Sequence, residues 1–94
     1  MSSIQIVVAT KDLEFRVSLS AALRSEPSFI VAGEASDESG FHALRRQLDP
    51  DILLLDSSLA GLVHDAVISW PAVRIILLAT TIDERHVMQQ SSRA

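Results

Sequence analysis

Four short apolar runs recur along the chain at similar spacing. They are IQIVVA from Ile4, FIVA from Phe29, DILLL from Asp51 and VRIILLA from Val73. Three of them are nearly continuous in Val, Ile and Leu, whereas a strand with one solvated face alternates apolar and polar residues. The pattern therefore predicts a parallel sheet whose strands are buried on both faces, with helices covering both sides.

The segment after the first run has the periodicity of a helix. Starting at Phe15, apolar residues fall at i, i+4, i+7 and i+8, which places them on one stripe. Asp12 precedes the stripe as the predicted N-cap, and Pro27 lies just past its end.

A second helix is predicted between the second and third runs. Its apolar stripe begins at Phe41 and continues to Leu48, after the capping candidates Ser36 and Asp37. Asp49-Pro50 is expected to end it, because the residue before a proline disfavours helical geometry.

The last two helices have weaker signals. Only nine residues separate Gly61 from Pro71, so the third helix is predicted to be about two turns long and irregular. The fourth is predicted to begin at TIDE, where Thr81 and Glu84 have the spacing of a capping box.

Strands and helices thus alternate four times with short connections, which predicts one doubly wound α/β domain over residues 1–94. In such a sheet, functional sites lie outside the carboxyl ends of the strands. Those ends are predicted at residues 10–11, 34–35, 56–57 and 79–80.

Three motifs resemble a known family: VAGEASD at 31–37, PDILLLD at 50–56, and PAVRIILLAT at 71–80. The chain resembles the receiver domain of two-component response regulators, most closely the subfamily that precedes a helix-turn-helix DNA-binding domain. The resemblance implies a flavodoxin-like sheet, with the four strands found here in the order 2-1-3-4. It also implies that Asp56 occupies the position that takes a phosphoryl group from a histidine kinase.

The rest of the family's site does not match. Receivers hold Mg²⁺ with an acidic pair after the first strand, where this chain has Thr10 and Lys11, and Asp12 follows one residue late. A lysine ammonium has no lone pair to give a metal, so no metal or other cofactor is expected. At the switch position of the fourth strand, where the family has a hydroxyl residue, this chain has Ala79, and a shift of one residue in the alignment would place the Thr80 hydroxyl there instead.

Lys11 is expected to pair with Asp56, because it would lie at the adjacent strand end. Three functions remain open. The first is a degenerate receiver that acts by protein contact, independently of phosphorylation and without enzymatic activity. The second is a working phospho-acceptor in which Asp12 or a neighbouring acid recruits Mg²⁺. The third is a flavodoxin-like module that binds a small molecule in the emptied pocket.

The composition argues against several other classes of protein. The chain has 94 residues and no cysteine, so it has no disulfide or thiol nucleophile. No apolar run reaches the roughly 18 residues of a membrane span. The net charge of −4, with no basic stripe, argues against direct nucleic-acid binding. We expect a cytoplasmic protein that contacts neither membrane nor nucleic acid.

The carboxyl-terminal part carries the last expectation. The family's fifth strand and helix have no counterpart before Ala94, so the fourth strand would form an open, apolar edge. Two alternatives follow. The chain is either a fragment whose continuation supplies the strand or a self-associating module, and for the chain as given we expect a homodimer. A histidine kinase or an output domain of the parent protein is another possible partner. The predicted interface consists of Arg74, Ile76, Leu78, Val87 and Met88.

Overall fold

Strands and helices alternate along the chain in the computed structural model, which describes residues 3–78. The elements are β1 (Ile4–Ala9), α1 (Leu13–Arg24), β2 (Phe29–Ala35), α2 (Glu38–Arg45), β3 (Ile52–Asp56), the 3-10 helix η1 (Ser57–Leu62), α3 (Val63–Ser69) and β4 (Arg74–Leu78). In this part of the chain, no helix is long and apolar enough to cross a bilayer.

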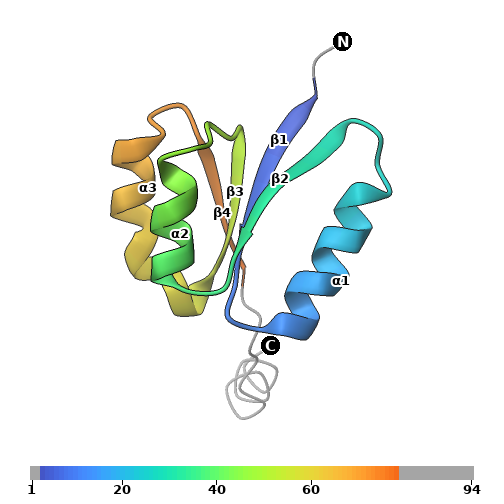
Figure 1. Cartoon of the computed structure of the whole chain (residues 1–94), viewed down its shortest axis with the longest axis horizontal. Helices are drawn as coiled ribbons and strands as arrows, with labels where there is room; N and C mark the ends of the chain where they lie inside the picture. Colours follow the sequence, from blue (N-terminus) through green and yellow to red (C-terminus); the bar gives the residue numbers. More distant parts are fainter. Residues whose placement is uncertain (1–2, 79–94) are drawn as a thin grey trace, which may run out of the picture.

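The four strands form one parallel sheet in the order β2-β1-β3-β4 (Figure 1). This order confirms the predicted doubly wound, flavodoxin-like arrangement. β1 and β3 are the two inner strands and are almost completely buried, which explains why their sequences are continuous in apolar residues. β2 and β4 form the two edges of the sheet in the described residues.

β2 extends beyond its apolar run and ends at Ala35, within the strand end predicted at residues 34–35. It continues past Ala32 to Ala35, and a bulge shifts its register against β1 between Ile6 and Val7. Beyond the bulge, α2 packs closely on Gly33: a Cβ added there would lie 3.0 Å from Leu44 Cδ2. The polar and small residues that ended the sequence signal are therefore part of the strand.

One face of the sheet is closed by α2 and α3. Its core is a cluster of buried apolar residues in which Phe41 and Trp70 are the largest. Their rings meet edge to face, with centroids 5.4 Å apart, a favourable aromatic geometry. The Trp70 indole Nε1 donates a hydrogen bond of 2.6 Å to the carbonyl of Leu48, so its polar atom is satisfied on this face.

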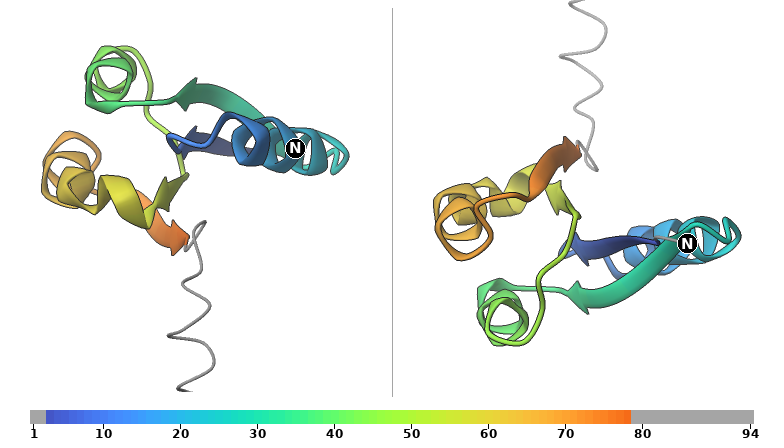
Figure 2. Two further views of the ribbon diagram at one scale, coloured as in Figure 1. Left: turned by 90° about the horizontal axis from the view of Figure 1, so that it is seen from below. Right: turned by 90° about the horizontal axis from the view of Figure 1, so that it is seen from above.

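Among residues 3–78, the opposite face has one helix, α1. Its core consists of Ile6, Val8 and Leu54, with partly buried side chains such as Leu19 packed around them. Figure 2 shows α1 beside β1 and β2, with α2 and α3 on the other side of the sheet. Helices therefore cover both faces, as predicted, although the described helices cover this second face only in part.

The caps of α1 and α2 and the end of α2 can be compared with the prediction. Asp12 caps α1 as predicted, and Asp37 caps α2 through a hydrogen bond of 2.8 Å from the Gly40 amide, so Ser36 is not the cap. α2 ends at Arg45, earlier than Asp49-Pro50, because the following residues turn back onto the carbonyl of Leu44. Leu48 still packs on the core from this turn.

The third helix is short, as predicted, but η1 precedes it and had no sequence signal. The fourth predicted helix, at Thr81, lies outside the described residues.

Candidate functional site

Asp56 is the last residue of β3, between the ends of β1 and β4. Its side chain is buried, with only 3% of the residue exposed. The carboxyl end of the sheet therefore places this acid where ligands of doubly wound folds bind, but largely out of contact with solvent.

Thr10 contacts this carboxylate directly. The Thr10 hydroxyl donates a buried hydrogen bond of 2.8 Å to Asp56 Oδ2, and Thr10 itself is 0% exposed. The same hydroxyl oxygen accepts a hydrogen bond of 3.2 Å from the Asp12 amide. Thr10 thus links the start of the β1–α1 loop to the acid at the end of β3, 46 residues later in the sequence.

The second carboxylate oxygen has a local structural role. Asp56 Oδ1 accepts a hydrogen bond of 3.1 Å from the Ser58 amide, which makes Asp56 the N-cap of η1. An aspartate in this position satisfies an amide that the helix leaves without an internal acceptor. Both oxygens of Asp56 therefore contribute to holding the chain at the end of β3.

The predicted ion pair between Lys11 and Asp56 is wrong. Lys11 is exposed, and it forms no ion pair with any described residue. The physical reason is that Thr10, which precedes it, is directed into the sheet and takes the contact with the carboxylate. Lys11 follows Thr10 in the loop after β1 and is exposed.

Arg16 and Glu34 form a charged network that sequence reasoning missed. The Arg16 guanidinium donates to the carbonyl of Thr10 at 3.4 Å and lies 3.5 Å from the Glu34 carboxylate. Arg24 pairs with the same carboxylate at 3.3 Å. Glu34 was placed at a predicted strand end, but neither arginine had a motif, because the pairing depends on how α1 lies over β2. The network supports the loop that holds Thr10.

The donor set at this end of the sheet does not fit a magnesium site. Thr10 is neutral, Lys11 offers an ammonium, and the Asp12 carboxylate accepts the Phe15 amide as the cap of α1. Mg²⁺ is bound in proteins mainly by carboxylate oxygens together with water. Within residues 3–78, no three acidic, histidine or cysteine side chains converge on a point that could hold a metal.

The remaining predicted residues fall in two groups. Arg74, Ile76 and Leu78 lie on β4, as expected. The switch residues and the two helical interface residues lie outside the described part of the chain: Ala79, Thr80, Val87 and Met88.

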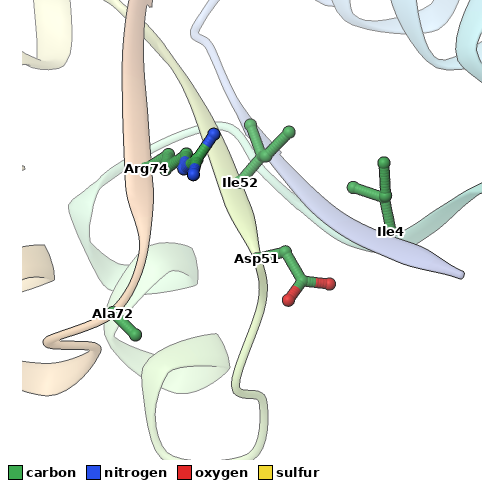
Figure 3. A pocket seen from close by; sticks show the side chains of 5 residues that line it. All are labelled: Ile4, Asp51, Ile52, Ala72 and Arg74. Atoms are coloured by element: carbon green, nitrogen blue, oxygen red, sulfur yellow. The ribbon is translucent and has the colours of Figure 1, made fainter. Parts of the chain in front are cut away.

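A shallow hollow lies at the opposite, amino end of the strands (Figure 3). It has a volume of about 300 Å³ and is lined by Ile4, Asp51, Ile52, Ala72 and Arg74. The Asp51 carboxylate is already engaged there, because it accepts a hydrogen bond of 2.8 Å from the Gln5 amide. This hollow is separate from Asp56, since the two lie at opposite ends of β3.

None of the known protein-family models matches the chain, and neither does any curated protein sequence. Solved structures do. The isolated REC domain of RcsB from Salmonella enterica serovar Typhimurium, in the presence of phosphomimetic BeF3−, aligns with a TM-score of 0.76 and 16% identity. That alignment covers 97% of this chain and 72% of the RcsB chain.

Two further structures extend the comparison. The signal receiver domain of NarL from Mycobacterium tuberculosis aligns with a TM-score of 0.73 and 28% identity, over 99% of this chain and 79% of that one. Salmonella RcsB bound to promoter rprA aligns with a TM-score of 0.72 and 18% identity, over 81% of this chain and 42% of that one. The chain therefore spans less than half of that RcsB. These neighbours confirm the resemblance read from the sequence: this chain has the fold of a response-regulator receiver domain.

Proposed function

We propose that this chain is a degenerate receiver domain that works by protein contact, without phosphorylation at Asp56. The observation that carries the proposal is the buried hydrogen bond between the Thr10 hydroxyl and Asp56 Oδ2. It places a neutral donor of the protein itself on the carboxylate that would act as the nucleophile.

The chemistry of phosphoryl transfer explains why this matters. The transfer depends on positioned positive charge that neutralises the phosphoryl oxygens, and a metal ion usually supplies much of it. Here the residue at the place of the family's acid is Thr10, and Asp12 is committed to capping α1. Asp56 also caps η1, so its carboxylate has structural tasks that do not need any reaction. The domain is proposed to have no enzymatic activity and no bound metal.

The partners follow from the same proposal. Protein is the expected partner class: a second copy of this chain, a histidine kinase, or an output domain of the parent protein. RcsB, one of the structurally similar proteins, has been solved bound to promoter rprA. The net charge of −4 on this chain supports placing any DNA contact outside it. We expect a cytoplasmic location with no membrane contact.

The main alternative is a working phospho-acceptor receiver that needs Mg²⁺. The position of Asp56 at the end of β3 favours it, because that is where the fold presents a reactive carboxylate. The third reading, a small-molecule module, would need a site at this end of the sheet, whereas the hollow of Figure 3 lies at the other end.

Acetyl phosphate with Mg²⁺ separates the two main readings. The unmodified chain is incubated with both, and intact-mass spectrometry measures whether one phosphoryl group is added. We expect no addition, and we expect the double change Thr10→Asp with Lys11→Asp to bring measurable Mg²⁺ affinity. Phosphorylation of the unmodified chain, lost in Asp56→Asn, would establish the alternative.

Two controls are needed, one for folding of the double variant and one for the chemistry of the substitution. Far-UV circular dichroism must show that the double variant is folded, and Thr10→Ser serves as the conservative comparison. Thr10→Ser keeps the hydroxyl that donates to Asp56, so it should remain unmodified like the parent chain. Phosphorylation of Thr10→Ser, under conditions in which the parent chain takes no phosphoryl group, would contradict the role given to the Thr10 hydroxyl.

A further inference from the structure

Thr10 is held at several of its atoms, and the contacts come from different parts of the fold. Its hydroxyl donates to Asp56 Oδ2 and accepts from the Asp12 amide. Its backbone amide donates to the carbonyl of Ala35, the last residue of β2, at 3.0 Å. Its carbonyl accepts from the Arg16 guanidinium at 3.4 Å. The residue that contacts Asp56 is therefore fixed from β2 and α1 as well as from its own loop.

The Arg16 side chain reaches this loop from α1. It is 19% exposed, so most of it is shielded from water. It uses two different nitrogens: Nη1 donates to the Thr10 carbonyl, and Nε lies 3.5 Å from Glu34 Oε1. Because the guanidinium group is planar and rigid, the contact at one nitrogen fixes the direction of the other. Glu34 therefore orients the group that Arg16 presents to Thr10.

The sheet in turn fixes the position of Glu34. This residue lies in β2 opposite Val8 of β1, and the next pair in the register is Ala9 with Ala35. The end of β2 thus holds Thr10 twice, directly through the Ala35 carbonyl and indirectly through Glu34 and Arg16. β2 and β3 are not neighbours in the sheet, because β1 lies between them. Thr10 is the residue through which this end of β2 is linked to the acid at the end of β3.

Arg24 provides a comparison within the same network. It pairs with the same Glu34 carboxylate at 3.3 Å, but its side chain is 57% exposed. Among residues 3–78, its hydrogen bond goes to Glu34 and none goes to Thr10. Two arginines therefore share one carboxylate, and Arg16 is the one that connects it to the loop.

We infer that Arg16 is a positioning residue for the Asp56 site: its guanidinium, oriented by Glu34, holds the Thr10 hydroxyl on the Asp56 carboxylate. When Arg16 releases the Thr10 carbonyl, the loop between β1 and α1 moves more freely and the hydroxyl leaves Asp56 more often. The shielding of Asp56 then depends on a charge pair between α1 and β2 that does not touch it. This inference rests on the proposed function and adds a means by which the same site is regulated.

Amide hydrogen exchange, followed residue by residue with NMR, tests this role. The Asp12 amide donates to the Thr10 hydroxyl and reports on the loop. The Ser58 amide donates to Asp56 Oδ1 and reports on the acid itself, at a site on η1 that is separate from α1. The amide of Val8, fully buried in β1, reports opening of the whole sheet. A general loss of stability would accelerate exchange at Val8 at least as much as at the other two amides.

Arg16→Met is the main variant, because it removes the guanidinium and keeps an apolar side chain. We expect exchange at Asp12 to accelerate about fivefold more than at Val8, which corresponds to about 1 kcal/mol for one lost hydrogen bond. Exchange at Ser58 should accelerate in the same direction by a smaller factor. Arg24→Met is the matched control and should leave both ratios to Val8 unchanged. Equal acceleration at all three amides, or an equal effect of Arg24→Met, would overturn the inference.

Glu34→Gln provides a second test that leaves Arg16 in place. It removes the charge that orients the guanidinium, so exchange at Asp12 and Ser58 should again accelerate more than at Val8, by less than in Arg16→Met. The pair is partly exposed and therefore screened by salt. The difference from the parent chain should shrink at high salt. A Glu34→Gln variant with the exchange pattern of the parent chain at low salt would overturn the inference, even if Arg16→Met does not fold.

The failures of the two proposals are distinguishable, because one is measured by exchange and the other by mass. A parent chain that takes no phosphoryl group, together with equal acceleration at all three amides in Arg16→Met, overturns the role of Arg16 alone. A parent chain that takes a phosphoryl group at Asp56 overturns the proposed function, whatever the exchange rates.

Discussion

The two faces of the sheet differ in how completely they are covered. On one face, α2 and α3 close over a cluster that includes Phe41 and Trp70, both fully buried and in contact with each other. On the other, α1 packs on β1 and β2, and within the described part of the chain Ile76 at the β4 edge is about half exposed. The same four strands supply the side chains of both faces.

This difference in coverage predicts different roles for the two faces, one in folding stability and the other in association. Burial removes apolar surface from water, so the closed face provides most of the free energy of folding. Exposed apolar surface on the open face gives no such contribution in the monomer and is available for contact with a partner. We therefore expect changes on the closed face to alter stability and changes at the β4 edge to alter association.

The largest expected effect is on the closed face. Phe41→Ala should lower the free energy of unfolding by about 3–5 kcal/mol, because it removes a buried ring and leaves a cavity. Phe29→Ala is the matched change on the open face, where the ring is only partly buried, and should cost about 1–2 kcal/mol. Urea titration measures both. Equal losses would show that the two faces do not differ in their contribution to folding.

The next effect concerns the acid at the end of β3. Thr10→Val nearly preserves shape but removes the hydroxyl that donates to Asp56, so it should cost about 1–3 kcal/mol. In a double-mutant cycle with Asp56→Asn, the two losses should not add, because the residues are in direct contact. Additive losses in the urea midpoints would mean that this hydrogen bond does not stabilise the fold.

A smaller effect is expected from the charged network under α1. Glu34→Gln removes the carboxylate that faces Arg16 and Arg24, which are partly exposed. Such pairs contribute about 0–1 kcal/mol and are screened by salt. The loss should therefore shrink when the titration is repeated at high salt. A loss that is independent of salt would point to packing of α1 instead of charge.

The smallest effect is expected at Lys11. Its side chain is exposed and makes no ion pair with the described residues, so Lys11→Met should change the free energy of unfolding by less than about 0.5 kcal/mol. A loss of stability as large as that of Thr10→Val would contradict this expectation and indicate that Lys11 interacts with Asp56.

Much of the fold could be predicted from apolar periodicity. The continuous runs located all four strands, and the order β2-β1-β3-β4 followed from short right-handed crossovers and the family resemblance. The end of α2 and the bulge in β2 could not be predicted in this way. Both depend on tertiary contacts, such as the packing of α2 on Gly33, that local sequence does not encode.

The site was predictable in position but not in its contacts. Asp56 stands where the motif placed it, and the substitution of the family's acids by Thr10 and Lys11 was visible in the sequence. Which of these two neighbours reaches the carboxylate depends on the direction of each side chain at the end of β1. In the structure it is the Thr10 hydroxyl that donates to the Asp56 carboxylate, whereas Lys11 is exposed.

The central claim is that this domain associates through contacts that do not depend on a phosphoryl group. Sedimentation velocity of the full chain, with and without acetyl phosphate and Mg²⁺, tests it most directly. We expect a concentration-dependent dimer whose fraction is the same in both conditions. A dimer fraction that rises or falls on treatment, and returns to the untreated value in Asp56→Asn, would contradict the account.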